Sequence, residues 1–249
     1  MEGLSEPDAE NILANKGLFD PENWHRLIKI YSGNPAALKI VADAIQYLFK
    51  GKVSEYLELN TVILGDISDL LENQFDRLSA LETKIMYCLA IARQPILFSE
   101  LRESLFCAAS PSEMLEAIES LERRSLIEKD ASEANEVLFT QQPVVMKYVT
   151  RRFAESVSEE LQKLLTTKDI EVINLLNSHP IFTSHAPDEV REVQIRLIVT
   201  PIKEKLIASF RTKSKIIEQL NRAMAILPED LFLERGYAVN NLEYILSVF

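Results

Sequence analysis

Apolar residues recur at helical spacing through most of this chain. The clearest run follows Pro143, where an apolar side chain returns every fourth residue at Val145, Val149, Phe153, Val157, Leu161 and Leu165. Such a stripe covers one face of a helix and is typical of packing against neighbouring helices. A shorter stripe lies at Leu38, Val41, Ala42, Ile45 and Leu48, and the whole chain has only six glycines. The pattern therefore predicts a mainly α fold.

Capping residues mark where the predicted helices begin and end. Ser5 with Pro7 predicts a first helix that stops at Gly17. Asp20-Pro21 joins a capping carboxylate to a proline at the first helical position, ahead of Trp24, Leu27, Ile28 and Tyr31. Gly33 ends that helix, and Asn34-Pro35 begins the next by the same device. Further starts are predicted at Ser79 with Glu82, at Ser99, at Ser110-Pro111-Ser112-Glu113 and at Pro187-Asp188.

The section from 65 to 165 has the order of a winged helix. A short extended stretch, Pro95-Ile96-Leu97-Phe98, separates two of three predicted helices, and the third carries Leu115, Ile118 and Leu121 on its inner face. Leu126-Ile127-Glu128-Lys129 and Val137-Leu138-Phe139-Thr140 then predict two strands around a polar turn. Three helices followed by a hairpin form a winged helix, which is a helix-turn-helix variant.

Three parts are predicted along the chain: a helical subdomain at 1-64, a winged helix with its following long helix at 65-165, and a C-terminal helical region at 166-249. In the last part, Pro201 should break or kink a helix near Thr200, because it lacks the donor N–H. Ile216, Leu220, Met224 and Ile226 predict another helix. The cluster Lys203, Lys205, Arg211, Lys213 and Lys215 is interpreted as a solvated face, since the region holds 10 basic and 11 acidic residues.

Charge argues against nucleic acid as a partner. The chain has a net charge of -11, and residues 66 to 150 hold 8 Lys or Arg against 15 Asp or Glu, a net of -7. The third helix of the winged helix turns Glu113, Glu116, Glu119 and Glu122 outward, where they would face phosphates, and Arg123 and Arg124 come only at its end. Use of this module in protein–protein contacts is favoured.

No catalytic or metal-binding motif stands out. His25, His179 and His185 lack any metal-ligand spacing, and no GxSxG elbow is present. Gly51-Lys52 resembles the end of a P-loop, but Gln46 and Val53 occupy positions where the motif needs glycine and Ser or Thr. Cys88 and Cys107 lie in apolar segments and are expected to be buried hydrophobes. Because there is no export signal and no membrane-length apolar run, we expect a cytoplasmic protein. Because no P-loop is present, we expect the chain to have no enzymatic activity of its own.

Longer stretches resemble the NB-ARC signalling NTPases of the STAND class. Gly3-Leu4-Ser5, Tyr31-Ser32-Gly33-Asn34-Pro35 and Leu38-Lys39-Ile40-Val41-Ala42 are similar to their first helical subdomain. Gly65-Asp66-Ile67, Gln74-Phe75-Asp76-Arg77-Leu78 and Ser125-Leu126-Ile127-Glu128-Lys129 resemble their winged-helix subdomain. Arg191-Glu192-Val193-Gln194-Ile195-Arg196-Leu197-Ile198 and Gly236-Tyr237-Ala238 are similar to the linker of cyanobacterial forms that carry WD or pentapeptide repeats.

The resemblance implies a set of cofactor-binding residues. Gly33, Asn34 and Pro35 form the Gly-x-Pro element, whose proline packs against adenine in the family; taken locally, the same triplet is simply a good helix corner. The Met-His-Asp motif of the family falls at Gln141-Gln142-Pro143. The amide of Gln142 could replace the histidine that donates to the β-phosphate, whereas Pro143 cannot make the polar contacts of an aspartate.

The function implied is that of a regulatory part of a nucleotide-dependent switch. Its cofactor would be ADP or ATP, held by an NTPase domain in cis or in trans, because the 249 residues contain no GxxxxGK[ST] motif. We expect negligible nucleotide affinity for the chain alone, a protein effector, and homo-oligomers as a further partner class. The alternatives are a winged-helix DNA-binding regulator and an adaptor that binds a partner through the C-terminal helices without nucleotide.

Overall fold

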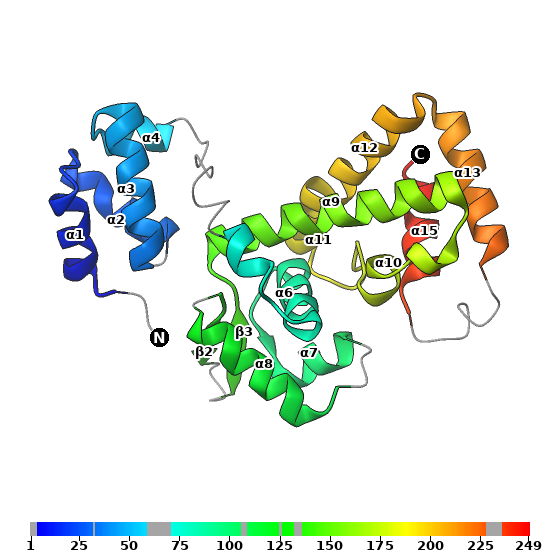
Figure 1. The fold of residues 1–249 in the computed structure, drawn as a ribbon, viewed down its shortest axis with the longest axis horizontal. Helices are drawn as coiled ribbons and strands as arrows, with labels where there is room; N and C mark the ends of the chain where they lie inside the picture. The colour runs from blue at the N-terminus through cyan, green and yellow to red at the C-terminus, as the bar shows by residue number, and fades with distance from the viewer. Residues whose placement is uncertain are drawn as a thin grey trace. The chain divides into compact units, whose positions relative to one another are not determined.

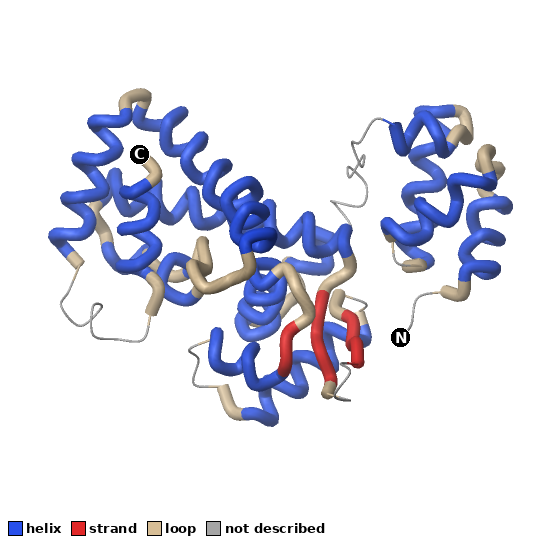
Figure 2. The backbone as a smooth tube through the Cα atoms, turned by 180° about the vertical axis from the view of Figure 1, so that it is seen from behind, coloured by secondary structure: helices blue, strands red, loops and turns tan. Residues whose placement is uncertain are grey.

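The computed structural model describes residues 4–31, 33–58, 71–105, 109–124, 126–131, 136–227 and 236–249. Helices make up nearly all of its regular structure, and three short strands form one small sheet (Figures 1 and 2). The mainly α fold predicted from the sequence is confirmed. Two compact units alternate along the chain: Met1–Ala80 with Glu116–Glu128 and Gln141–Tyr148, and Leu81–Leu115 with Lys129–Thr140 and Val149–Phe249.

The first unit begins with packed short helices, α1 (Glu6–Asn15), η1 (Pro21–Asn23), α2 (Trp24–Ile30), α3 (Pro35–Phe49) and α4 (Val53–Glu58). Ser5 caps α1 as predicted, since its hydroxyl accepts from the Asp8 N–H at 3.4 Å. Apolar residues at the predicted spacing fill the core, among them Leu27, Ile28, Leu38 and Ile45. The hydroxyls of Tyr31 and Tyr56 share a buried hydrogen bond of 2.5 Å that joins the end of α2 to α4.

Asp20 acts differently from the prediction. It lies in the left-handed region with φ 63° and makes no capping bond to the helical turn that follows it. Its carboxylate instead accepts from the backbone N–H of Ser54 at 3.1 Å and from the Ser54 hydroxyl. These two bonds lower the pKa of Asp20. Asp20 therefore caps α4 from a distant point in the chain, which the local sequence did not indicate.

The winged-helix segment follows the predicted order, with one added strand. Its elements are α6 (Ala80–Ala92), β1 (Ile96–Leu97), α7 (Phe98–Ser104), α8 (Pro111–Arg123), β2 (Glu128–Ala131) and β3 (Val137–Thr140). The sheet order is β1-β3-β2. β1 pairs antiparallel with β3, with Ile96 opposite Phe139. Figure 2 shows β3 as the central strand. The extended stretch predicted at 95–98 is thus the third strand of the wing.

Two local predictions in this segment are wrong. α7 begins at Phe98, and the Glu100 carboxylate accepts from the Leu97 N–H at 2.8 Å, so Ser99 is not its cap. Leu115 does not line the inner face of α8: it is 47% exposed, and the fully buried Met114 takes that place. The start of α8 is as predicted, because Ser110 and Glu113 exchange the two bonds of a capping box.

The C-terminal part is helical, as expected. It contains α9 (Pro143–Thr167), η2 (Ile170–Val172), α10 (Leu175–Ser178), α11 (Asp188–Gln194), η3 (Ile195–Val199), α12 (Thr200–Phe210), α13 (Lys213–Ile226) and α15 (Ala238–Ser247). All six residues of the predicted α9 stripe are buried. Figures 1 and 2 show α12, α13 and α15 gathered beside the second half of α9.

Pro201 does not break its helix. The chain runs from α11 into α12 through η3, a π-helical turn that directly precedes Thr200. Proline has no N–H to donate to the carbonyl of an earlier turn. The π-helical turn shifts the hydrogen-bond register at this point, so the helix continues through Pro201 without an interruption. In α13, Ile216 and Leu220 are buried as predicted, whereas Ile226 is exposed.

The boundaries predicted between the three parts of the chain stay predictions. The boundary at 64/65 lies outside the described residues, as do Cys107 and most of the polar turn of the wing. The boundary at 165/166 falls within the last turn of α9. None of the helices in the described ranges is long and apolar enough to cross a bilayer.

Candidate functional site

The Gly33–Pro35 triplet forms the corner between α2 and α3. Gly33 has φ 64°, a conformation that costs glycine little and other residues more. Its carbonyl accepts from the Leu4 N–H at 3.0 Å, and the Asn34 side chain accepts from the Ala37 N–H at 3.1 Å. Pro35 is the first residue of α3 and is exposed. The corner is thus well built, and its proline ring is accessible to a ligand.

Gln142 and Pro143 lie where β3 leads into α9. Gln142 is buried, and its amide nitrogen donates to a carboxylate oxygen of Glu128 at 3.1 Å. Its carbonyl accepts from the Met146 N–H, while Pro143 is exposed at the first helical position. An amide nitrogen carries two N–H groups, so the bond to Glu128 uses one of them. That Gln142 and Pro35 face the same nucleotide stays a prediction.

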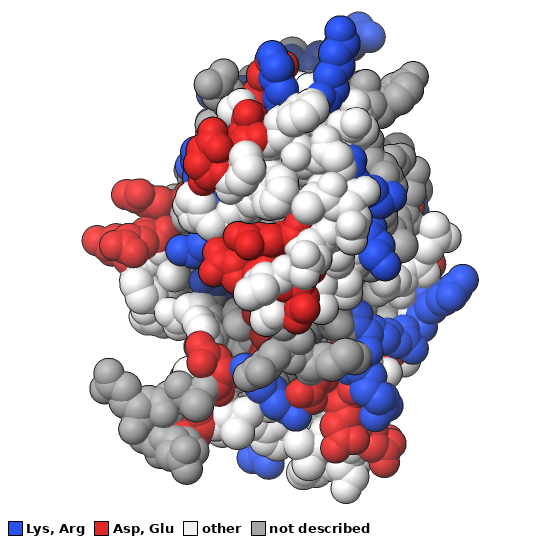
Figure 3. All heavy atoms as spheres, turned by 90° about the vertical axis from the view of Figure 1, so that its left-hand side faces the viewer, with Lys and Arg blue, Asp and Glu red and all other residues white. Residues whose placement is uncertain are grey.

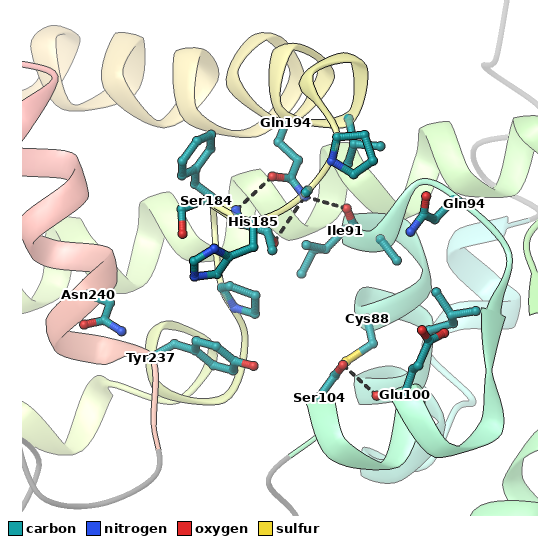
Figure 4. Close-up of a pocket in the computed structure, with 18 of the residues that line it drawn as sticks. Cys88, Ile91, Gln94, Glu100, Ser104, Ser184, His185, Gln194, Tyr237 and Asn240 are labelled. Carbon is teal, nitrogen blue, oxygen red and sulfur yellow. Dashed lines mark hydrogen bonds between the residues drawn. The ribbon is translucent and has the colours of Figure 1, made fainter.

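A cavity of about 670 Å³ lies in the second unit, within the size range of small-ligand pockets. Figure 4 shows Tyr237 and Asn240 on one side of it, facing Cys88, Ser104 and Glu100 on the other. The loop at 180–187, with Phe182 and His185, forms part of its lining, and Gln194 closes one end. Among the described residues of its lining there is no Lys or Arg, and Glu100 is the one acidic residue. The described part of the lining therefore consists mainly of apolar, aromatic and neutral polar side chains.

Three buried polar residues hold the cavity together. The amide oxygen of Gln194 accepts from the Thr183 N–H at 2.9 Å, and its nitrogen donates to the Ile91 carbonyl at 2.8 Å. Asn241 accepts from the Ile181 N–H at 3.0 Å and donates to the carbonyls of Leu176 and His179, both at 2.8 Å. Except for the bond between Gln194 and Thr183, each joins segments far apart in sequence. These side chains fix the loop against α6 and α15.

His179 is the third of these residues. Its Nε2 lies 3.1 Å from the Lys84 carbonyl, which can only accept, so Nε2 carries the proton and Nδ1 accepts from the Ser178 hydroxyl. Its ring stands edge-on to Tyr87 and Phe153. Burial lowers the pKa of His179 to about 4. With both ring nitrogens engaged, His179 acts as a structural group.

Aromatic side chains line the cavity beside these polar groups. Phe182 stacks on Tyr244 with ring centroids 4.2 Å apart. Burial raises the pKa of Tyr237, and the nearby Cys88 thiol raises it further. Burial also raises the pKa of Tyr244. Both phenols therefore stay protonated at neutral pH.

Metal chemistry gains no support here. Among the described residues, no group of three or more His, Cys, Asp or Glu side chains is placed to hold an ion.

The basic cluster of the C-terminal part, predicted to be a solvated face, differs from the prediction at Lys203. Its side chain donates to the Val248 carbonyl and lies over the Phe249 ring.

The polar residues that fix the cavity were missed by the sequence analysis. Asn241 falls on the same helical face as Ala238, Leu242 and Ile245, all of them buried. Gln194 likewise precedes the buried pair Ile198 and Val199 on one helix. A lone amide within an apolar stripe was therefore an available signal, since such a group is buried only where partners exist for it.

The fold and site define a mainly α chain in which a winged-helix segment is followed by a helical region, with a cavity that residues of both line. The chain is 39% identical, over 277 aligned positions, to an uncharacterized WD repeat-containing protein, alr2800, of Nostoc sp. strain PCC 7120. The match covers 99% of this chain and 22% of that protein, so the chain spans about a fifth of its relative. No protein-family model matches the chain, and no solved structure matches it.

Proposed function

We propose that this chain is the regulatory part of an NB-ARC-type nucleotide switch, which covers ADP or ATP held by a P-loop domain. The observation that carries the proposal is the order of its elements: a helical corner with an exposed proline, a winged helix, and a buried glutamine at the start of the following long helix. In such an arrangement Pro35 packs against the base and the second N–H of Gln142 donates to a phosphate.

The similarity to a WD repeat-containing protein supports the same reading. A nucleotide switch needs a sensing region, and repeat arrays offer extended binding surfaces of the required kind. The ligand of this switch, its effector and any homo-oligomer that it forms remain parts of the proposal.

The decisive experiment tests the two contacts separately. The reading frame upstream of Met1 is first inspected for GxxxxGK[ST], and the domain that carries it is purified in complex with this chain. Release of a fluorescent ADP analogue is then measured by stopped flow. Loss of a hydrogen bond to a charged phosphate in Gln142→Ala should speed release about tenfold or more, and Pro35→Ala should speed it as well.

Matched variants control for folding. Pro21→Ala removes another helix-start proline and Gln162→Ala removes a glutamine within α9, and both should release the analogue at the wild-type rate. If Pro35→Ala and Gln142→Ala also leave the rate and the activity of the complex unchanged, an adaptor that never uses nucleotide is the better interpretation. The cavity of the second unit, with its aromatic lining, would then be the first surface to examine for a partner.

A DNA-binding regulator is the remaining alternative. Glu113, Glu116 and Glu119 are exposed on α8, the helix that would enter the major groove. Figure 3 shows Asp and Glu side chains interspersed with Lys and Arg across one face of the molecule. A gel shift with genomic fragments at low salt should show no specific complex, whereas salt-sensitive specific binding would favour this alternative.

A further inference from the structure

The cavity of the second unit is walled by two parts of the chain. α6, β1 and α7 of the winged-helix segment line it on one side, and the loop at 180–187 lines it together with α11 and α15. Figure 4 shows Tyr237 and Asn240 across the open space from Cys88, Ser104 and Glu100. The volume of about 670 Å³ is in the range of small-ligand pockets. A molecule bound there would contact both parts at once.

The lining offers an apolar surface to such a molecule. Ile91, Ile96 and Cys88 line the cavity and are otherwise enclosed by the protein, since they are only 4–6% exposed. The rings of Phe182 and Tyr244 lie parallel with their centroids 4.2 Å apart, so each ring holds the other in place. Covering these groups removes apolar surface from water, which favours binding. An aromatic or aliphatic body therefore fits this part of the lining.

Glu100 brings a fixed carboxylate to the same cavity. One of its oxygens accepts from the Leu97 N–H at 2.8 Å at the start of α7. Within the part of the chain that the structure describes, its other oxygen has no hydrogen-bond partner and no Lys or Arg side chain pairs with it. A carboxylate accepts short, charge-assisted hydrogen bonds from an ammonium group. Aromatic faces attract cations as well, so the open oxygen and the rings together favour a cation over an anion.

We propose that the cavity binds a small organic cation, in which an ammonium group is joined to an aromatic or aliphatic body. The ammonium group donates to the open carboxylate oxygen of Glu100, and the body packs against Ile91, Ile96 and the ring of Tyr244. Bound in this way, the ligand connects α7 with α15 and stabilises one arrangement of the two. The site uses none of the residues proposed for nucleotide binding, and the proposal does not depend on that function.

Calorimetric titration of the whole chain with tyramine, which joins a phenol ring to an ammonium group, tests the site. Tyramine should bind with one-to-one saturation. para-Ethylphenol has the same body without the charge and should bind about tenfold more weakly or not at all, because it cannot make the charge-assisted hydrogen bond. Glu100→Gln should weaken tyramine binding by the same factor and leave para-ethylphenol unchanged. Its amide oxygen still accepts from the Leu97 N–H, so the start of α7 is kept. Glu103→Gln, which changes an exposed carboxylate of the same helix, should leave both affinities unchanged.

Isoleucine methyl NMR locates the bound probe. The signals of Ile91 and Ile96, assigned from their loss in Ile91→Val and Ile96→Val, should shift with the affinity that calorimetry gives. The signal of Ile202, which is buried in α12 and does not line the cavity, should stay in place.

Four results would each overturn the proposal. Tyramine gives no saturable binding, or para-ethylphenol or para-hydroxyphenylpropionate binds as tightly as tyramine does. Folded Glu100→Gln binds tyramine like the wild type. The methyl signals shift at Ile202 and not at Ile91 and Ile96.

Discussion

Single buried polar residues carry much of the specificity of the second unit. Gln194, Asn241 and His179 lie among apolar neighbours, and each satisfies backbone groups of a distant segment. Leaving such a backbone group buried without a partner costs about 1–3 kcal/mol. These three side chains therefore select one position for the loop at 180–187, and with it the shape of the cavity.

His179 makes the stability of this unit depend on pH. Its folded pKa of about 4 lies below the ordinary value of 6.5, so below pH 6.5 the unfolded chain binds a proton that the folded chain does not. The free energy of unfolding should then decrease by up to about 1.4 kcal/mol for each pH unit between 6.5 and 4. Above pH 6.5 both forms are neutral, and this contribution is constant.

Urea unfolding of the wild type and of His179→Gln at pH 7 and pH 5 measures the effect. The variant keeps a side-chain donor for the Lys84 carbonyl but has no titrating group, so its stability should fall less between the two pH values. His185→Gln, which changes an exposed histidine of the cavity lining, should show the wild-type dependence. Equal pH dependence in all three proteins would contradict the role given to His179.

At the scale of elements, helix ends determine where the chain turns. Ser110 and Glu113 form the predicted capping box, and Gly33 with Asn34 forms the predicted corner between α2 and α3. Caps also come from elsewhere in the chain, as the bonds from Ser54 to Asp20 show. A cap predicted from neighbouring residues is therefore reliable only where no distant group competes for it.

The Asn34 cap has a measurable contribution. Asn34→Ala removes the acceptor for the Ala37 N–H and should lower the free energy of unfolding by about 1 kcal/mol. Asn34→Ser retains an acceptor and should be close to the wild type. Asn11→Ala, at an exposed position within α1, controls for the general effect of alanine in a helix. A folded Asn34→Ala variant as stable as Asn34→Ser would show that the corner does not depend on this bond.

At the scale of the whole molecule, the absence of a phosphate-binding P-loop motif from the 249 residues is as informative as the helical segments that are present. The 249 residues contain the helical and winged-helix segments that we propose to belong to a nucleotide switch, but no GxxxxGK[ST] motif. Phosphate binding usually supplies the main anchor for a nucleotide. The chain matches about a fifth of a much longer relative.

We therefore predict no ATP hydrolysis by the purified chain. A phosphate-release assay should give the rate of the buffer alone, with or without magnesium. Turnover that stays with the protein through successive purification steps would contradict the prediction, and with it the assignment of catalysis to a separate domain.

The sequence by itself determined the helical character of the chain, most helix starts and the order of the winged helix. These features depend on local chemistry: an apolar stripe such as Val145 to Leu165 requires one helix face to be buried, and Ser110 with Glu113 satisfies the first backbone groups of α8 wherever that helix lies. The residues assigned to nucleotide binding came from resemblance, and their joint role stays a prediction.

Only the tertiary structure decided which polar groups meet. Asn241 with Ile181, Gln194 with Ile91 and Asp20 with Ser54 are pairs separated by many residues, and no local pattern specifies them. The same holds for the cavity, whose lining comes from segments far apart in the sequence. Partners of this kind are selected by the cost of burying an unpaired polar group, which exists only once the helices have packed.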